Sequence, residues 1–342
     1  MAPAKSRTPR LALIGSDSLK GKEILRILTA KKFPVASFEL FDPDVEEEYS
    51  KLSQFRGEAK VVHALSPAAL EGLDLVFLAA DDETNLRYGR LAAEKDFTAI
   101  DLGESFNADT KIPLIVAGVN DAILRKDRPG LIANPHPATI VLVHILSALE
   151  AGFGVEKAVS VVLEPASAYA EEGIQELAEQ SYALLGSTAL CKRVFPDQIA
   201  FNLLTRTTRP ERNGFSPLEN RVAAEVRRVL APAAPPLSLT IILAPVFHTY
   251  SIMIHFELRR DASVAEIETC LKKNDIFRLA AAGEAGAATP AKVAGKDRIH
   301  IGPVKKDVAI AKGFWAWAIA DNLTVGSGLN AYGIVRALVG DA

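Results

Sequence analysis

The chain has 342 residues, of which 49% are hydrophobic and 24% are charged, and its formal net charge is −3. This length suits two domains that each bury a core, and the small negative charge gives no case for a nucleic-acid or membrane-surface partner. No apolar run is long enough to span a bilayer. The six histidines lack metal-ligand spacing and neither cysteine has a C-x-x-C partner, so no metal site or disulfide is predicted.

Strands and helices are predicted to alternate over the first part of the chain. Residues 1–10 are basic and lack the apolar core of a signal peptide, so we expect a disordered leader on a cytoplasmic protein. This alternation favours an α/β fold, with a Rossmann-like, doubly wound parallel sheet over residues 11–133. Strands are predicted at 11–14, 39–41, 73–80 and 98–102, and helices at 23–30 and 84–94.

The pattern changes where residues 131–140, L-I-A-N-P-H-P-A-T-I, end one strand and open a helix predicted at 138–151. Longer strands with partial alternation follow, at 158–163, 239–246 and 251–258. They favour an α+β dimerisation domain over residues 134–321, whose mixed or antiparallel sheet has helices on one face and room for a second subunit on the other. A low-complexity loop at 279–295 and a helix at 322–342, which packs back on the first domain, complete the prediction.

The turn before the helix predicted at 138–151 is where we expect an active site. A strand that feeds a helix N-terminus directs backbone N–H groups and a dipole end to one point, which can hold an anion or a nucleophile. Pro137 stands there, and its ring offers no nucleophile, proton or metal ligand, although its φ suits the first helical position. His136 could serve as a replacement nucleophile, but two X-Pro steps favour a polar residue in a stiff turn.

Four segments follow one another in a distinctive order along nearly the whole chain. They are V-A-G-V-N at 116–120 with L-I-A-N-P-H-P-A-T-I at 131–140, F-P-D-Q-I-A-F-N at 195–202, P-V-F-H-T-Y-S at 245–251, and D-N-L-T-V-G-S-G-L-N-A at 321–331. In these segments the chain resembles the aspartate-semialdehyde dehydrogenase family. The resemblance implies the family's two-domain fold, a homodimer, and the NADP-dependent reductive dephosphorylation of aspartyl phosphate through a thioester on a cysteine.

Four positions depart from the family pattern in a way that removes chemistry. Pro137 stands at the nucleophilic cysteine, and Glu164 at a glutamine that positions the substrate carbonyl. Leu243 aligns with the arginine for the substrate carboxylate, and Asn107 with an arginine that binds phosphate. The resemblance therefore implies a member that has lost the thioester route.

Other substrate-site positions keep family-type residues, namely Asn134, Glu219, Arg221 and the histidine position, His248. Without a thiol, His248 has no proton to take, so we expect its ring to be hydrogen-bonded to Glu164 or Glu219. Cys191 and Cys270, which do not open a helix after a turn, are expected to be structural.

The family's G-x-x-G-x-x-G turn is present from Gly15 to Gly21, with Ser18 at the middle glycine. Ser18 and the neighbouring Asp17 oppose a bound pyrophosphate, which Lys20 partly compensates. An acidic loop with Asp42, Asp44 and the run 46–48 repels a 2′-phosphate, so NADP is not expected and NAD is left open. We favour a solvated acidic loop over a ribose clamp. The resemblance adds two cofactor-site positions late in the chain, Asn322 and Gly326.

Three functions fit these observations. The leading hypothesis is a protein of the family fold without dehydrogenase activity, acting as a binding, scaffold or regulatory homodimer with a small-molecule ligand between its domains. The second is an active NAD(P)-dependent oxidoreductase of amino-acid biosynthesis in which His248 and Glu164 act as acid and base without a thiol. The third is an interaction module that pairs with a genuine dehydrogenase subunit through the shared dimer surface.

Overall fold

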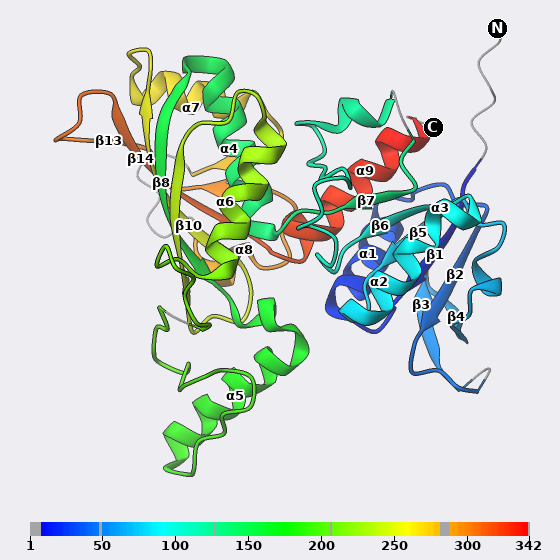
Figure 1. Ribbon diagram of the computed structural model, residues 1–342. Coiled ribbons are helices and arrows are strands. Elements are labelled where there is room, and N and C mark those ends of the chain that lie inside the picture. Colours follow the sequence, from blue (N-terminus) through cyan, green and yellow to red (C-terminus); the bar gives the residue numbers. More distant parts are fainter. Residues whose placement is uncertain (1–7, 48–49, 126–127, 206, 281–287, 341–342) are drawn as a thin grey trace, which may run out of the picture. The chain divides into compact units, whose positions relative to one another are not determined.

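The computed structural model describes residues 8–47, 50–125, 128–205, 207–280 and 288–340 (Figure 1). The chain divides into two compact units, Met1–His136 with Ser327–Ala342, and Pro137–Gly326. The division falls after His136 rather than after residue 133. Most of the expected leader, residues 1–7, lies outside the described residues, and Arg10 already belongs to the first strand, so a leader reaching residue 10 is one residue too long.

A seven-stranded sheet, as far as the structure describes the chain, forms the centre of the first unit, in the order β3-β4-β2-β1-β5-β6-β7. All its ladders are parallel except the one that joins β3 to β4. The predicted doubly wound parallel sheet is therefore confirmed, with an unpredicted hairpin at one edge. The strands are β1 (Arg10–Ile14), β2 (Ser37–Asp42), β3 (Leu52–Phe55), β4 (Glu58–Ala64), β5 (Leu75–Leu78), β6 (Thr98–Asp101) and β7 (Leu131–Ala133).

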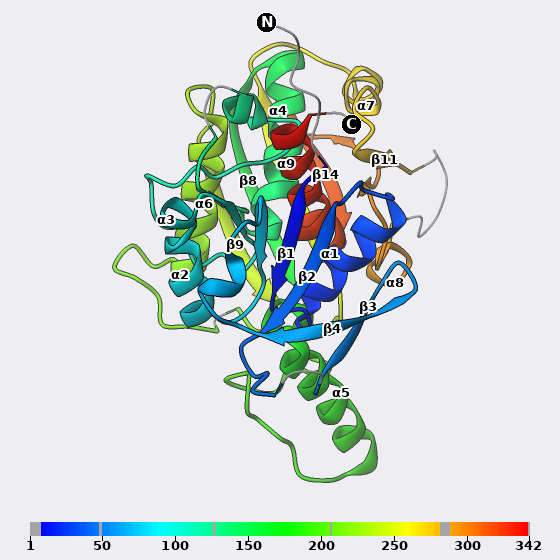
Figure 2. The same ribbon diagram turned by 90° about the vertical axis from the view of Figure 1, so that its right-hand side faces the viewer.

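Helices cover both faces of this sheet, and Figure 2 shows α1 on one side with α2 and α3 on the other. Leu11 and Leu13 of β1 pack in one core with Ile24 and Leu28 of α1 and with Ile334 of α9. The elements are α1 (Leu19–Ala30), α2 (Asp82–Arg90), α3 (Ala92–Lys95) and α9 (Leu329–Val339), with short 3₁₀ turns η1 (Ala68–Leu70) and η2 (Asp121–Arg125).

Besides its apolar packing, the C-terminal helix is held to the rest of the first unit by the side chain of Asn330. Asn330 donates from Nδ2 to Ile115 O and to Asn134 Oδ1, both at 2.8 Å, and its Oδ1 accepts from Ala117 N at 2.8 Å. The helix is shorter than the predicted 322–342, because a π-helical turn, η4 (Thr324–Gly328), precedes it. Asp321 caps that turn, accepting from Thr324 N at 2.8 Å.

The second unit contains a mixed sheet, as predicted. Its order is β11-β12-β14-β10-β8-β9 over the described residues, with β13 paired to β14. The ladders β8–β9 and β11–β12 are parallel and those around β10 and β14 are antiparallel. The strands are β8 (Val155–Glu164), β9 (Leu237–Leu243), β10 (Tyr250–Leu258), β11 (Phe277–Leu279), β12 (Ile299–Ile301), β13 (Lys305–Lys306) and β14 (Gly313–Ala320).

One face of this sheet is covered by helices and the other is partly open. Figure 1 shows α4 and α6 on the same side of the sheet. On the opposite face, Val159 and Trp315 are both cross-strand partners of His255, and they remain 48% and 40% exposed. The helical segments are α4 (Pro137–Phe153), η3 (Ala166–Tyr169), α5 (Ala170–Gly186), α6 (Pro217–Leu230), α7 (Val264–Lys272) and α8 (Pro290–Val293). Because α8 forms within 279–295, the stretch predicted as a loop contains a short helix. Residues 281–287 of that stretch lie outside the described residues.

Helix α4 is buried without interruption from Pro137 to Leu146, and His144 is one of these buried residues. Burial lowers the pKa of His144 from 6.5 to about 4. Below pH 6.5 the unfolded chain therefore takes up a proton that the folded chain excludes. The free energy of unfolding should fall by about 3 kcal/mol as the pH drops from 6.5 to about 4. Urea denaturation at several pH values measures this slope. Replacing His144 by leucine should flatten it; an unchanged slope would contradict the assignment.

Candidate functional site

The turn between β7 and α4 is built by backbone and side-chain bonds. Asn134 donates its N–H to Asp101 O at 3.0 Å, and its side chain accepts from Asn330. Pro137 is the first residue of α4, as predicted, and it is buried. A Cβ built on Gly326 would lie 2.6 Å from Pro137 Cβ, so this close approach requires a glycine. Asn134 thus fixes the turn by hydrogen bonds, while Pro137 and Gly326 pack closely against each other.

Glu164 ends β8 as a buried carboxylate held by two phenols. Its Oε1 accepts from Tyr250 Oη at 2.9 Å and its Oε2 from Tyr169 Oη at 3.3 Å. Burial raises the pKa of Tyr169 above its ordinary value, and the negative charge of Glu164 adds to this shift. The raised pKa keeps the Tyr169 phenol protonated, so that it donates to Glu164 as Tyr250 does.

Leu243 lies directly across the β8–β9 ladder from Glu164. It is 1% exposed and belongs to an apolar core of the second unit. The position that the resemblance assigns to a carboxylate-binding arginine is thus occupied by a core side chain. The other buried members of this core are Ala166, Leu177, Phe195, Ile199 and Ala200.

His248 lies in the segment between β9 and β10 and is half-buried. Its ring makes no hydrogen bond to any residue of the described chain, so the expected bond to Glu164 or Glu219 is wrong. The reason is that both carboxylates have other donors: two tyrosine phenols donate to Glu164, and backbone N–H groups of the α6 cap and of β9 donate to Glu219. Asn322 lies nearby, where its Oδ1 accepts from Thr249 N and from Ser167 Oγ, both at 3.1 Å. Asn322 thus joins η3 to the segment before β10.

Glu219 is a structural residue of α6. It completes a capping box, with Oε2 accepting from Ser216 N at 2.6 Å, while Oε1 accepts from Thr240 Oγ1 and Ile241 N, both at 2.8 Å. Although burial opposes the charged form, these hydrogen bonds lower the pKa of Glu219 below its ordinary value. The carboxylate joins the start of α6 to β9.

The first turn of α4 is tied to α6 through Glu225. Thr139 Oγ1 donates to Glu225 Oε2 at 2.6 Å, and Arg221 Nε lies 3.9 Å from the other carboxylate oxygen. Arg221 is therefore brought close to the helix that Pro137 begins. The sequence does not predict this network, because nothing in the local pattern around a single glutamate on an amphipathic helix indicates which residue it will contact.

The thiol of Cys270 is far from this turn. Its Sγ donates to Ala148 O at 3.4 Å, and the rise of a helix places Ala148 about 16 Å from Pro137. Cys191 follows α5, where its carbonyl accepts from Gln180 Nε2 at 2.8 Å. Within the described part of the chain, no three His, Cys, Asp or Glu side chains are arranged to hold a metal ion.

Two positions of the glycine turn in the first unit have no room for a side chain. Gly15 has φ of 88°, and a Cβ on it would lie 2.5 Å from Ala80 N. A Cβ on Gly21 would lie 2.1 Å from Gly15 O. Ser18 caps α1: its Oγ accepts from Gly21 N at 2.9 Å and donates to Gly15 O at 3.0 Å. One N–H that could hold a phosphate is thus already satisfied.

The side chain of Lys20 contacts the loop that follows β6. Its Nζ donates to Leu102 O at 2.7 Å and to Glu104 Oε1 at 3.0 Å, so the ammonium group is bound to two oxygens of the first unit. Burial raises the pKa of the adjacent Asp101 to about 6, although two backbone N–H groups donate to it. Asn107 follows this loop and is 4% exposed, so it is part of the interior.

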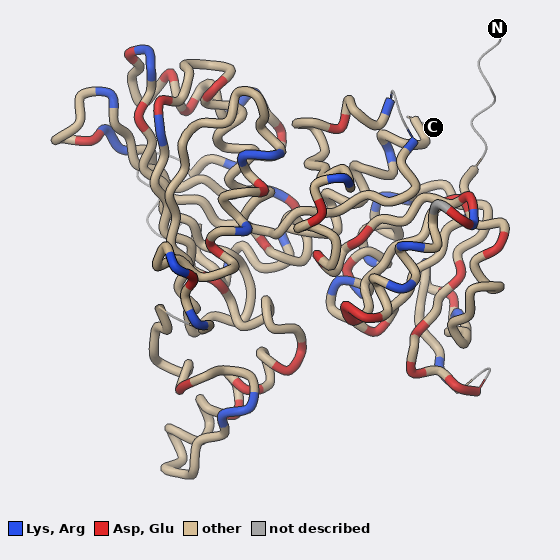
Figure 3. Tube along the Cα trace, in the orientation of Figure 1, with Lys and Arg blue, Asp and Glu red and all other residues tan. Residues whose placement is uncertain are grey.

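The loop after β2 is rich in acidic residues (Figure 3). Asp42 is 3% exposed and accepts from Ser16 Oγ at 2.6 Å, so the expectation of a solvated loop is wrong for this residue. Asp44 and residues 46–47 are exposed, and Glu48 lies outside the described residues. The carboxylates and the Ser18 cap together do not fit a 2′-phosphorylated dinucleotide.

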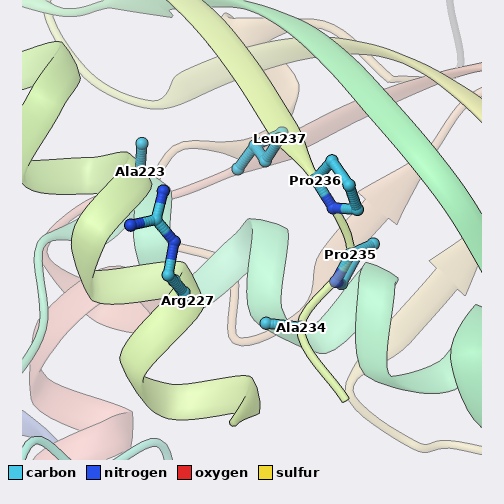
Figure 4. Close-up of a pocket in the computed structure, with 6 residues that line it drawn as sticks. All are labelled: Ala223, Arg227, Ala234, Pro235, Pro236 and Leu237. Atoms are coloured by element: carbon cyan, nitrogen blue, oxygen red, sulfur yellow. The ribbon is translucent and has the colours of Figure 1, made fainter. Parts of the chain in front are cut away.

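A cavity of about 290 Å³ lies elsewhere in the second unit, between α6 and the segment before β9 (Figure 4). Arg227 reaches it from α6, and its other walls are apolar. The sequence-predicted site residues do not line it.

These elements define an α/β protein with a Rossmann-like first unit and a second unit built on a mixed sheet. Residues 10–126 match the family described as semialdehyde dehydrogenase, NAD binding domain, and residues 146–325 match semialdehyde dehydrogenase, dimerisation domain. The chain belongs to the aspartate-semialdehyde dehydrogenase family. None of its helices, over the residues described, is both long and apolar enough to cross a bilayer.

Similar proteins cover the chain from end to end. The aspartate-semialdehyde dehydrogenase of Shewanella violacea is 26% identical over 332 residues, covering 97% of this chain and 98% of that protein. Aspartate-semialdehyde dehydrogenase 2 of Vibrio cholerae is 28% identical over 338 residues, with 97% and 98% covered. The crystal structure of aspartate semialdehyde dehydrogenase II from Vibrio cholerae superposes with a TM-score of 0.90 at 26% identity, covering 98% of this chain and 99% of that one.

Proposed function

We propose that this chain is a binding or regulatory member of the aspartate-semialdehyde dehydrogenase family that forms no thioester with its ligand. The observation that carries this proposal is Pro137 as the buried first residue of α4. A thioester needs a thiolate, and the proline ring supplies no nucleophile. Cys270 offers no replacement, because its hydrogen bond to Ala148 places it about 16 Å along α4.

The surroundings of the turn support the same reading. Glu164, with its two phenol donors, brings a negative charge beside Leu243, which is packed in an apolar core. A carboxylate substrate would therefore meet a buried carboxylate instead of a cation at this end of β8 and β9.

Purified chain should show no turnover above background with aspartate semialdehyde, phosphate and either NADP or NAD, followed by absorbance of the reduced cofactor. The dehydrogenase of Vibrio cholerae, assayed in parallel, shows that the substrates are active. Turnover that persists in a variant with both Cys191 and Cys270 replaced by serine would indicate a non-thiol reaction. Turnover that disappears in that variant would show that a distant thiol does reach the site. Either form of turnover would remove the proposal.

We further infer a cytoplasmic homodimer joined through the open face of the second unit's sheet. The match to a dimerisation domain and the exposed side chains of Val159 and Trp315 support this arrangement, and the two unpaired cysteines suit a reducing compartment. Light scattering of the purified chain measures the mass. Replacement of Val159 by lysine should shift it toward the monomer, and pairing with a different dehydrogenase subunit would be seen as a co-purifying chain of another mass.

A second candidate is an oxidoreductase that reduces a free aldehyde or imine without a thioester. It is favoured by the half-buried His248, whose ring is not committed to a bond within the described chain. A hydride transfer needs an acid to protonate the product, and a histidine can supply it. Consumption of NADH with small aldehydes, abolished by replacing His248 with alanine, would support this function.

A further inference from the structure

Lys51, the residue before β3, lies among three carboxylates of the first unit. Its Nζ is 2.7 Å from Asp17 Oδ2, 3.3 Å from Asp42 Oδ2 and 3.2 Å from Asp44 Oδ2. The side chain of Lys51 is 22% exposed, while that of Asp42 is 4% exposed. Three segments, namely the glycine turn, the end of β2 and the start of the β3–β4 hairpin, therefore meet at one ammonium group.

Asp42 stands where a dinucleotide-binding protein of this fold has the acidic residue that binds the ribose. Asp42 is the last residue of β2, and the glycine turn contacts it through Ser16 Oγ at 2.6 Å. Gly15 N also donates to Phe41 O at 2.8 Å, one residue before. In this fold an acidic residue at the end of the second strand accepts from the ribose hydroxyls of the adenosine half. A bound ribose and Lys51 would compete for the same carboxylate.

We propose that Lys51 is an internal plug that closes the adenosine-ribose subsite of the nucleotide-binding unit by holding Asp17, Asp42 and Asp44 together. Because Lys51 already holds the Asp42 carboxylate, a dinucleotide whose ribose hydroxyls bind Asp42 must first break these charge-assisted bonds. This inference goes beyond the proposed function, because it concerns the first unit and not the chemistry at Pro137.

The charge of Lys51 supports such a closed state. Although burial opposes its charged form, the bond to Asp17 and the charges of Asp42 and Asp44 raise the pKa of Lys51 above its ordinary value. One ammonium group does not offset three carboxylates, so the subsite is negative with or without the lysine. A 2′-phosphate is therefore repelled in either case, whereas a plain ribose is excluded only while the plug is in place.

Fluorescence titration with NADH and NADPH tests the plug. Replacing Lys51 by alanine should tighten NADH binding by about tenfold or more, because Asp42 becomes available to the ribose hydroxyls. NADPH binding should not improve. Lys51→Arg, which keeps the cation, should behave like the original chain. Lys95→Ala is the matched control, since it removes a lysine whose ion pair with Glu71, at 2.7 Å, lies away from the glycine turn.

A second variant covers the case in which Lys51→Ala does not fold, as judged by circular dichroism. Lys51→Gln keeps most of the side chain but removes the ammonium group that holds Asp42, so it should also tighten NADH binding. Adding Asp42→Asn to a variant that gains NADH binding should abolish the gain. The plug is refuted if folded Lys51→Ala gains no affinity, if it gains NADPH as much as NADH, or if the original chain already binds NADH equally well. Each of these outcomes leaves the turnover assay unaffected.

Discussion

Replacing Glu219 by alanine should lower the free energy of unfolding by about 4 kcal/mol. The change removes the N-terminal capping box of α6 and leaves two further donors, Thr240 Oγ1 and Ile241 N, without their charged acceptor. Because Glu219 is 8% exposed, water does not readily replace the lost bonds. Urea denaturation followed by circular dichroism measures the loss.

Glu266 provides the control for this prediction. It forms the same capping box at the start of α7 with Ser263, but it is exposed and bonds to no strand. Glu266→Ala should therefore cost much less than Glu219→Ala. Equal losses would show that the bonds to Thr240 and Ile241 contribute nothing.

Replacing Gly21 by alanine should cost a similar amount, about 4 kcal/mol. The new methyl group would lie 2.1 Å from Gly15 O, which is a backbone atom and cannot rotate away, so α1 must move away from β1. Leu28 and Ile24 of α1 are fully buried against the sheet and resist that movement. The measurement is again the free energy of unfolding in urea.

Gly186→Ala is the corresponding control, because a Cβ at this last residue of α5 meets nothing within 4 Å. It should leave stability nearly unchanged. A well-tolerated Gly21→Ala would mean that the first turn of α1 is adjustable. The retained glycine would then need another explanation, such as access to a bound nucleotide.

The candidate site divides into residues that the sequence could place and residues that it could not. Pro137 was correctly placed at the helix start, since a turn ending in proline before an apolar run is a local signal. The bond expected for His248 was wrong, because the partners of Glu164 and Glu219 come from Tyr250, Tyr169 and the start of α6. Lys51 was overlooked: it follows the acidic run by three positions, which was the one available hint.

By itself, the sequence determined the alternation of strands and helices, the mixed sheet of the second unit and the apolar α4, because these depend on periodic burial within short segments. It did not indicate β14, whose alanines have little strand preference, or the β3–β4 hairpin, whose residues are half exposed. Only the tertiary structure decided which carboxylates are held by which donors. Asp42 meets Lys51, and Glu219 meets Ile241, through the packing of elements that no local pattern relates.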